Sequence, residues 1–180
     1  MRRPALLIAA LAAVALVAGV VFTIVRISRD AAEVQSPPAQ NLAVTIGDQT
    51  FNLVDGAASK PAAPGSVGVE TVRVVGEGVS GDIDGDGKPE AALLLADDPG
   101  GSGTFYYAVL AVNDGKSWHA TNTLPLGDRI APQGIEYAGG QFVYRFMERK
   151  PGEPMAAEPS VLNTVPIRYD AGTGRISAWG

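Results

Sequence analysis

The chain has 180 residues and contains no cysteine, so we expect one domain with an appendage and exclude disulfides, thiolate zinc sites and cysteine catalysis. Residues 1–30 contain four arginines and one aspartate, a net charge of +3, which leaves a net charge of −8 on residues 31–180. Because this acidic remainder has no basic stripe, we expect no nucleic-acid partner.

The N-terminal segment is predicted to be a membrane anchor. Residues 4–25 form a stretch of 22 residues without a charge, which as a helix spans about 33 Å and crosses a bilayer core. A cleavable signal peptide, with its shorter apolar stretch, and a buried soluble helix are the alternatives. We expect residues 1–30 to be an uncleaved, single-pass transmembrane helix in the inner (cell) membrane. The free amino terminus favours an extracytoplasmic, periplasmic position for the rest of the chain.

A short linker over residues 31–41 is expected to lead into a β domain over residues 42–180. Residues 42–54 contain two β-prone runs around Gly47-Asp48, which predicts a hairpin. The stretch GAASKPAAPGS, residues 56–66, is typical of a low-complexity loop or an insertion.

Short β-prone runs separated by glycine and proline continue to the C-terminus. The predicted strands and hairpins are VETVRVV (69–75), AALLLA (91–96), TFYYAVLAV (104–112) turning at NDG into KSWHATN (116–122), GIEYAGGQFVYRFM (134–147) and VPIRYDAGTGRISAW (165–179). Residues 149–160 are expected to be a loop, and residues 120–127 or 160–164 a helical turn. The pattern favours an all-β fold, a small sandwich or barrel-like antiparallel domain.

The stretch GDIDGDGKPE, residues 81–90, has the spacing of a calcium loop. Asp82, Asp84 and Asp86 alternate along a tight loop, and carboxylates in this pattern converge on one point, as the six to eight oxygen ligands of Ca²⁺ require. Lys88 is expected to offer its carbonyl with its side chain outward, and Glu90 to close the shell. In a chain of this composition the D-x-D-x-D-G pattern is expected by chance only about 0.005 times.

Two other interpretations of the loop are a solvated acidic turn, in which the aspartates cap backbone amides, and a magnesium site. An EF-hand is not expected, because its twelfth position is a bidentate glutamate on a helix, whereas here it is Leu93 within a predicted buried strand.

The loop resembles the β-hairpin calcium loops of integrin-type FG-GAP repeats, D-x-D-x-D-G-x-x-D, with Asp82, Asp84, Asp86 and Glu90 on the matching places. That resemblance implies metal binding and not a propeller fold. Residues 78–170 also resemble a family of small exported bacterial proteins without assigned function, through the acidic loop, GGSGTFYY (100–107), LGDR (126–129) and PGEPM (151–155). This second resemblance implies export and leaves the activity open.

Several other residues are candidates for chemistry. His119 is the only histidine, so any histidine-dependent hydrolysis must use it, but it is more simply a surface or packing residue. Asp97 and Asp98, which are typical turn formers before Pro99, are candidates for a glycosidic carboxylate pair with Glu90. The remaining features are expected to be a turn at residues 100–104, a local ion pair or a turn at Asp128 and Arg129, and at least one exposed aromatic among residues 105–107.

Taken together, these features favour a membrane-anchored, extracytoplasmic Ca²⁺-binding β domain that is not an enzyme and binds a protein or another component of the cell envelope. The alternative is an envelope hydrolase that uses the acidic loop and His119. A sensor input is disfavoured because few residues are expected on the cytoplasmic side of the anchor.

Overall fold

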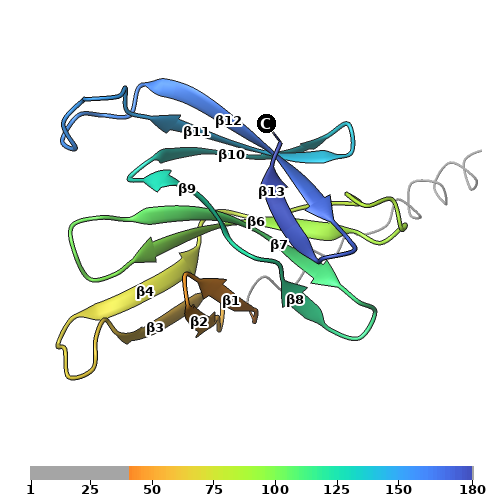
Figure 1. Cartoon of the computed structure of the whole chain (residues 1–180), viewed down its shortest axis with the longest axis horizontal. Helices are drawn as coiled ribbons and strands as arrows, with labels where there is room; N and C mark the ends of the chain where they lie inside the picture. Colours follow the sequence, from red (N-terminus) through yellow and green to blue (C-terminus); the bar gives the residue numbers. More distant parts are fainter. Residues whose placement is uncertain (1–40, 180) are drawn as a thin grey trace, which may run out of the picture. The chain divides into compact units, whose positions relative to one another are not determined.

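The computed structural model describes residues 41–179, and every regular element in this range is a β-strand (Figure 1). The strands are β1 (Ala43–Ile46), β2 (Gln49–Asn52), β3 (Ala57–Pro61), β4 (Val69–Val74), β5 (Val79–Gly81), β6 (Glu90–Asp98), β7 (Phe105–Asn113), β8 (Trp118–Ala120), β9 (Leu124–Asp128), β10 (Ala131–Ala138), β11 (Gln141–Glu148), β12 (Val161–Asp170) and β13 (Arg175–Ala178). The all-β prediction is therefore confirmed for this range. No apolar helix of membrane-spanning length occurs in it, and the predicted anchor over residues 1–30 lies outside the described residues.

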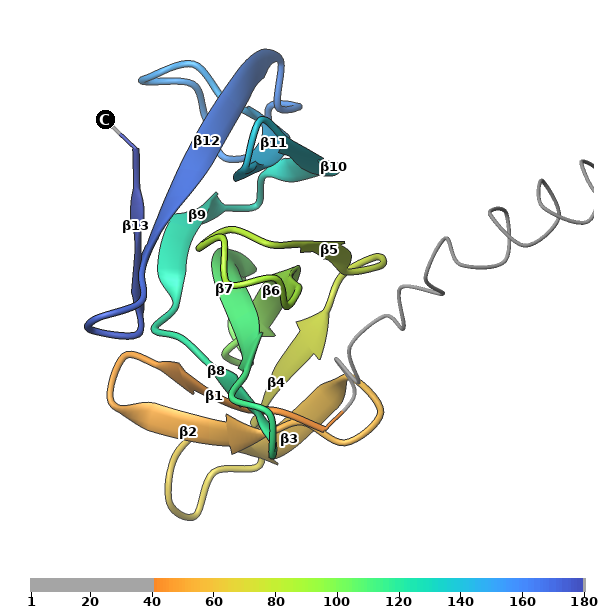
Figure 2. The ribbon, with the colours of Figure 1, turned by 90° about the vertical axis from the view of Figure 1, so that its right-hand side faces the viewer.

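All strand pairs are antiparallel, and they form three sheets. The hairpin β1–β2 is one sheet, and β10-β11-β12-β13 is a second. The central sheet has the order β3-β4-β6-β7-β8, and β5 and β9 pair with the remaining parts of β6 and β7. In the second view the hairpin lies on one side of β6 and β7 and the four-stranded sheet on the other (Figure 2).

Strands β6 and β7 are covered on both faces, which explains their continuous apolar sequences. Ala91, Leu93 and Leu95 pack into the hydrophobic core beneath the hairpin, here called the hairpin core. Ala92 and Leu94 pack into a second core against the four-stranded sheet. A half-solvated strand alternates apolar and polar residues, whereas a strand between two cores has no polar face. The apolar run after the acidic loop is therefore the buried centre of the domain.

The four-stranded sheet meets this centre through aromatic side chains of β11. Phe142, Tyr144 and Phe146 alternate along this strand and are buried. The Tyr144 hydroxyl donates a hydrogen bond that is shared between two carbonyl oxygens, that of Leu93 at 3.0 Å and that of Val109 at 3.1 Å. Burial raises the pKa of Tyr144, so this hydroxyl remains a donor. A polar contact thus ties the second sheet to β6 and β7 inside an apolar layer.

Three segments differ from their sequence-based predictions. Residues 57–61 are not a loop but strand β3, because they pair with β4 and Ala58 packs against the hairpin core. Residues 124–128 are not a helical turn but strand β9, which pairs with β7 and packs Leu124 and Leu126 against the second core. Residues 161–164 likewise begin β12 and pair with β11. In each case long-range pairing overrides a weak local signal.

Prolines occur in the strands that have an open edge. Pro61 lies in β3, Pro125 in β9 and Pro132 in β10, and each of these strands has a sheet partner on one side only. Pro166 lies in β12, just before the residues that pair with β13. Next to it, the Thr164 N–H donates to the Asn163 side chain at 2.8 Å instead of to another strand. These positions reduce the number of free N–H groups along exposed edges.

Candidate metal centre

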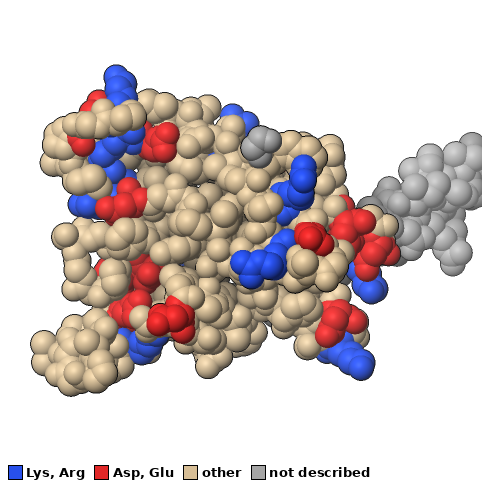
Figure 3. Space-filling view, in the orientation of Figure 1, with Lys and Arg blue, Asp and Glu red and all other residues tan. Residues whose placement is uncertain are grey.

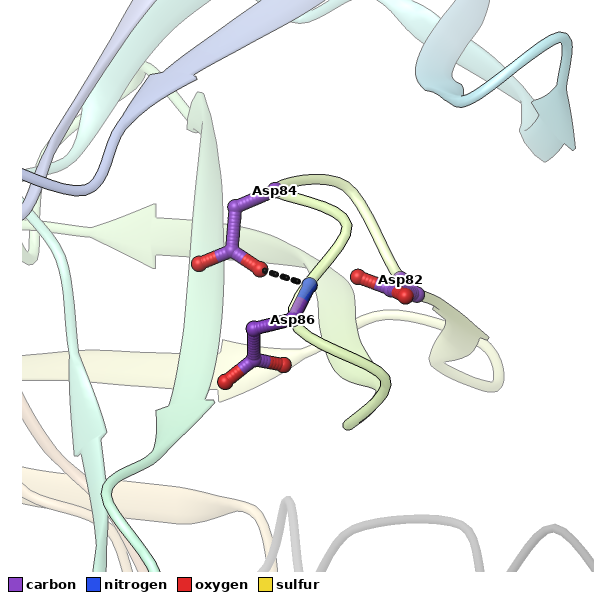
Figure 4. A group of neighbouring side chains, drawn as sticks. All are labelled: Asp82, Asp84 and Asp86. Carbon is purple, nitrogen blue, oxygen red and sulfur yellow. Dashed lines mark hydrogen bonds between the residues drawn. The ribbon is translucent and has the colours of Figure 1, made fainter.

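The loop between β5 and β6 brings three predicted ligands together. Each of Asp82, Asp84 and Asp86 offers a carboxylate oxygen, and these three oxygens lie within 4.8 Å of one another. Asp84 and Asp86 project to the same side of the turn, and Asp82 approaches from its first arm (Figure 4). Asp82 is half-buried and the other two are exposed. This group can hold a metal ion.

Backbone hydrogen bonds give the loop its shape. Asp82 accepts the N–H groups of Gly85 at 2.7 Å and Gly87 at 3.0 Å. Both glycines adopt left-handed conformations, with φ of 78° and 85°, which other residues reach only with strain. Asp84 accepts the Asp86 N–H at 3.1 Å. A carboxylate oxygen has two lone pairs, so an oxygen that accepts one amide still has capacity for a cation. Amide capping and metal binding are therefore compatible here.

Lys88 does not point away from the carboxylates as predicted. Its ammonium nitrogen lies 3.3 Å from Asp86 Oδ2, although the side chain is still 55% exposed. The Lys88 N–H also donates to Asp86 Oδ1 at 2.8 Å. This hydrogen bond from the backbone amide, together with the Lys88 ammonium, lowers the pKa of Asp86. The role of the Lys88 carbonyl as a ligand stays a prediction.

Glu90 is the first residue of β6 and is only 2% exposed. Its Oε2 accepts the Ile83 N–H at 3.0 Å, which ties the start of the loop to its end. Burial raises the pKa of Glu90, and the negative charges of Asp84 and Asp86 raise it further. Glu90 does not belong to the group of converging aspartates. Its role as the closing ligand stays a prediction.

Two tyrosines of the four-stranded sheet face this loop, and neither was anticipated from the sequence. The Tyr137 hydroxyl donates to the Asp82 carbonyl oxygen, and a Cβ at Gly81 would overlap with the Tyr137 ring. Burial and the charges of Asp84 and Glu90 raise the pKa of Tyr169. Residues 137 and 169 are far from the loop in sequence, so no local pattern could have indicated them.

The carboxylates proposed for glycosidic chemistry are not brought together. Glu90 and Asp97 are seven residues apart in the extended strand β6, a separation of about 23 Å, whereas glycosidic pairs are about 5 to 9.5 Å apart. His119 is exposed on β8, opposite Val112 of β7. Asp97 is not a turn former but a buried strand residue, whereas Asp98 accepts the Gly100 N–H at 3.1 Å in the turn that follows.

Other local predictions hold. The Asp128 carboxylate and the Arg129 guanidinium form an ion pair at 2.8 Å, which with the Thr104 N–H lowers the pKa of Asp128. Phe105 is 38% exposed, as predicted for at least one aromatic of that run.

Aspartate and glutamate residues gather at the end of the domain where the β5–β6 loop lies, with lysine and arginine residues beside them (Figure 3). Comparison with known proteins finds no matching family model, no matching curated protein and no matching solved structure. The case for a metal centre therefore rests on the arrangement of the loop itself.

Proposed function

We propose that this chain is a Ca²⁺-binding β domain in which the ion stabilises the fold. The observation that supports it is that Asp82, Asp84 and Asp86 of one loop each offer a carboxylate oxygen within 4.8 Å of the other two. Hard carboxylate oxygens are the ligands that Ca²⁺ prefers, and without a cation the three charges repel one another. In this proposal Glu90, the buried glutamate at the end of the loop, closes the shell from outside the converging group.

Ca²⁺ is preferred to Mg²⁺ because the loop is exposed and irregular. Mg²⁺ demands a near-octahedral shell at short distances, whereas Ca²⁺ accepts varied ligand numbers and angles. The loop joins β5 to β6 and contacts Tyr137 of β10, so an ion bound there stabilises the junction of two sheets. At ten times its dissociation constant, the ion contributes about 1.4 kcal/mol to the free energy of unfolding.

The proposed setting is the extracytoplasmic side of a membrane. In this proposal residues 1–30 anchor the chain and residues 42–180 form the exported domain, which binds a protein or another envelope component and is not an enzyme. Ca²⁺ concentrations outside the cytoplasm match modules with dissociation constants of about 10⁻⁴ to 10⁻³ M. The acidic charge of residues 31–180 is consistent with a protein partner and not with nucleic acid.

Thermal unfolding of the full chain in detergent, with added Ca²⁺ or Mg²⁺, tests the site. We expect millimolar Ca²⁺ to raise Tm by about 3 to 5 °C, Mg²⁺ to have a smaller effect, and Asp84→Asn to remove the Ca²⁺ response. Asp114→Asn is the matched control, because Asp114, like Asp84, accepts hydrogen bonds from exposed backbone N–H groups, here those of Lys116 and Ser117, but is not part of the converging group. An unchanged Tm for the unsubstituted chain at 10 mM Ca²⁺, on the order of ten times the weakest expected dissociation constant, rejects the proposal.

A further inference from the structure

A second cluster of polar and charged side chains lies across four strands at the other end of the central sheet. Lys60 of β3 lies opposite Glu70 of β4. Asp97 of β6 lies opposite Val72, two residues along β4 from Glu70, and Tyr107 of β7 lies opposite Leu95, two residues along β6 from Asp97, so the four residues form a diagonal row. Residues two apart in a strand point to the same face of a sheet. All four residues therefore lie on the face that forms the hairpin core, because each is two residues from a core residue of its own strand: Ala58, Val72, Leu95 and Val109. The row is separated from the acidic loop by the length of β6.

Both carboxylates of this row are buried, and one of them has no partner. Glu70 is 7% exposed and Asp97 is 5% exposed. Within residues 41–179, Asp97 Oδ1 is a buried side-chain oxygen without any hydrogen bond. The Lys60 ammonium lies 4.0 Å from Glu70 Oε2 and 3.7 Å from the centroid of the Phe51 ring. One ammonium group therefore faces two buried carboxyl groups, and it is closer to Glu70.

This imbalance of charge requires a compensating group. A buried carboxylate without a hydrogen bond or a counter-ion is strongly disfavoured, and such a group takes up a proton instead. A proton on Asp97 leaves the Lys60–Glu70 pair neutral as a whole and makes Asp97 uncharged. The proton comes from bulk water and returns there, so no other reactant is needed.

We propose that Asp97 is a buried proton-binding site beside Glu70 and that release of its proton at higher pH loosens the β1–β2 hairpin. The titratable groups around Asp97 come from four strands of the central sheet: Lys60 of β3, Glu70 of β4, Asp98 of β6 and Tyr107 of β7. Burial raises the pKa of Asp97, Glu70 and Asp98 raise it further, and Lys60 opposes them. Burial and the same carboxylates, Asp97 and Glu70, raise the pKa of Tyr107, so the phenol stays neutral.

The link to the hairpin is the position of Lys60. Its ammonium contacts the Phe51 ring, and Phe51 belongs to strand β2. When Asp97 loses its proton, two carboxylates compete for this one ammonium. The Lys60 side chain is 30% exposed and has room to move, so it is drawn toward Asp97 and away from the ring. The contact between β3 and the hairpin then weakens.

The direction of the pH effect follows from the raised pKa of Asp97. The folded chain holds this proton more tightly than the unfolded chain. The contribution of Asp97 to stability is therefore complete below the ordinary aspartate pKa, about 3.9, and is lost as pH rises through the higher folded value.

The experiment compares the full chain in detergent with Asp97→Asn and with Asp98→Asn, whose carboxyl group is exposed, all with a chelator present. We expect Tm and the amide exchange protection of β1–β2 to fall from pH 4.5 to pH 7.5 in the unsubstituted chain and in Asp98→Asn. Asp97→Asn should make this fall clearly smaller, with the remainder expected from Glu90, whose pKa is also raised, and should be at least as stable as the unsubstituted chain at pH 7.5. A fall in Asp97→Asn as large as that in the unsubstituted chain overturns the proposal.

Carbon NMR of the Asp97 carboxyl group supplies a measurement that does not depend on a substitution. A titration midpoint clearly above the ordinary aspartate value, about 3.9, supports the proposal, and a midpoint at or below that value overturns it. The same resonance is followed with Ca²⁺ and Na⁺ in the Asp84→Asn background, where the loop site is disabled. A shift produced by either cation identifies a cation site instead and also overturns the proposal. Because Asp84→Asn leaves this row intact, failure of the calcium site and failure of the proton site are distinguishable.

Discussion

At the scale of single residues, Lys88 opposes cation binding to the acidic loop. Its ammonium lies 3.3 Å from Asp86 Oδ2, an oxygen that a bound ion would use. We therefore predict that Lys88→Gln tightens Ca²⁺ binding by about threefold, a small factor because the pair is exposed and screened by solvent. Isothermal titration calorimetry at low ionic strength measures the change.

The matched control for this substitution is Lys116→Gln. Lys116 is an exposed lysine in the turn after β7, so this variant removes the same net charge without touching the loop. Equal effects of the two substitutions would indicate a long-range charge effect and contradict a direct competition at Asp86.

The sequence indicates the loop residues but not the buried row. Asp82, Asp84 and Asp86 are recognisable because their ligand geometry is encoded by spacing within one turn. Asp97 resembles a turn former because Pro99 lies two residues after it, whereas its burial and the charge of Glu70 near it arise from the pairing of different strands. Local patterns can therefore predict sites made within one loop, whereas a site assembled across a sheet requires the strand register.

At the scale of elements, the acidic loop is joined to the four-stranded sheet by close packing of β5 against β10. A methyl group at Gly81 would overlap with the Tyr137 ring, whose hydroxyl holds the Asp82 carbonyl. We predict that Gly81→Ala lowers the free energy of unfolding by about 1 to 3 kcal/mol and weakens Ca²⁺ binding. Denaturant unfolding and calcium titration measure the two effects.

Gly101→Ala serves as the control, because a Cβ there meets no heavy atom within 4 Å. A second variant, Tyr137→Leu, makes room beside position 81. If the overlap is the cause, the combination of Gly81→Ala with Tyr137→Leu should be less destabilising than the sum of the two single variants. Strict additivity would show that Gly81 acts through another contact.

Elements with a strong pattern could be predicted from the sequence, and those with a weak one could not. The β-prone run over residues 134–147 predicted β10 and β11, and the uninterrupted apolar run predicted β6. The strand β3 was missed because Ala57–Pro61 contains small and charged residues and a proline. Its pairing with β4 supplies what its own composition lacks.

At the scale of the whole molecule, the sheets end in open edges that need protection against pairing between copies. Pro61 lies in the edge strand β3, and the next residue, Ala62, donates its N–H to Gly68, on the side of β4. Because N–H groups alternate along a strand, position 61 faces outward. We predict that Pro61→Thr, which restores an N–H there, raises the fraction of dimer about threefold in size-exclusion chromatography with light scattering.

Pro154→Thr is the comparison variant, since Pro154 lies in the loop before β12 and in no sheet. The unfolding free energy of both variants should stay within about 1 kcal/mol of the unsubstituted chain, which separates association from loss of fold. A monomeric Pro61→Thr at high concentration would mean that the edge is protected by some other feature.

The double burial of β6 also has a consequence for the chain before it folds. The segment from Ala91 to Ala96 is uncharged and apolar, the kind of stretch that self-associates when nascent or misfolded chains expose it. Glu90 precedes it and Asp97 and Asp98 follow it. Negative charges at both borders make neighbouring copies of the segment repel one another. The carboxyl groups of these residues therefore act as gatekeepers against aggregation while the chain is being made.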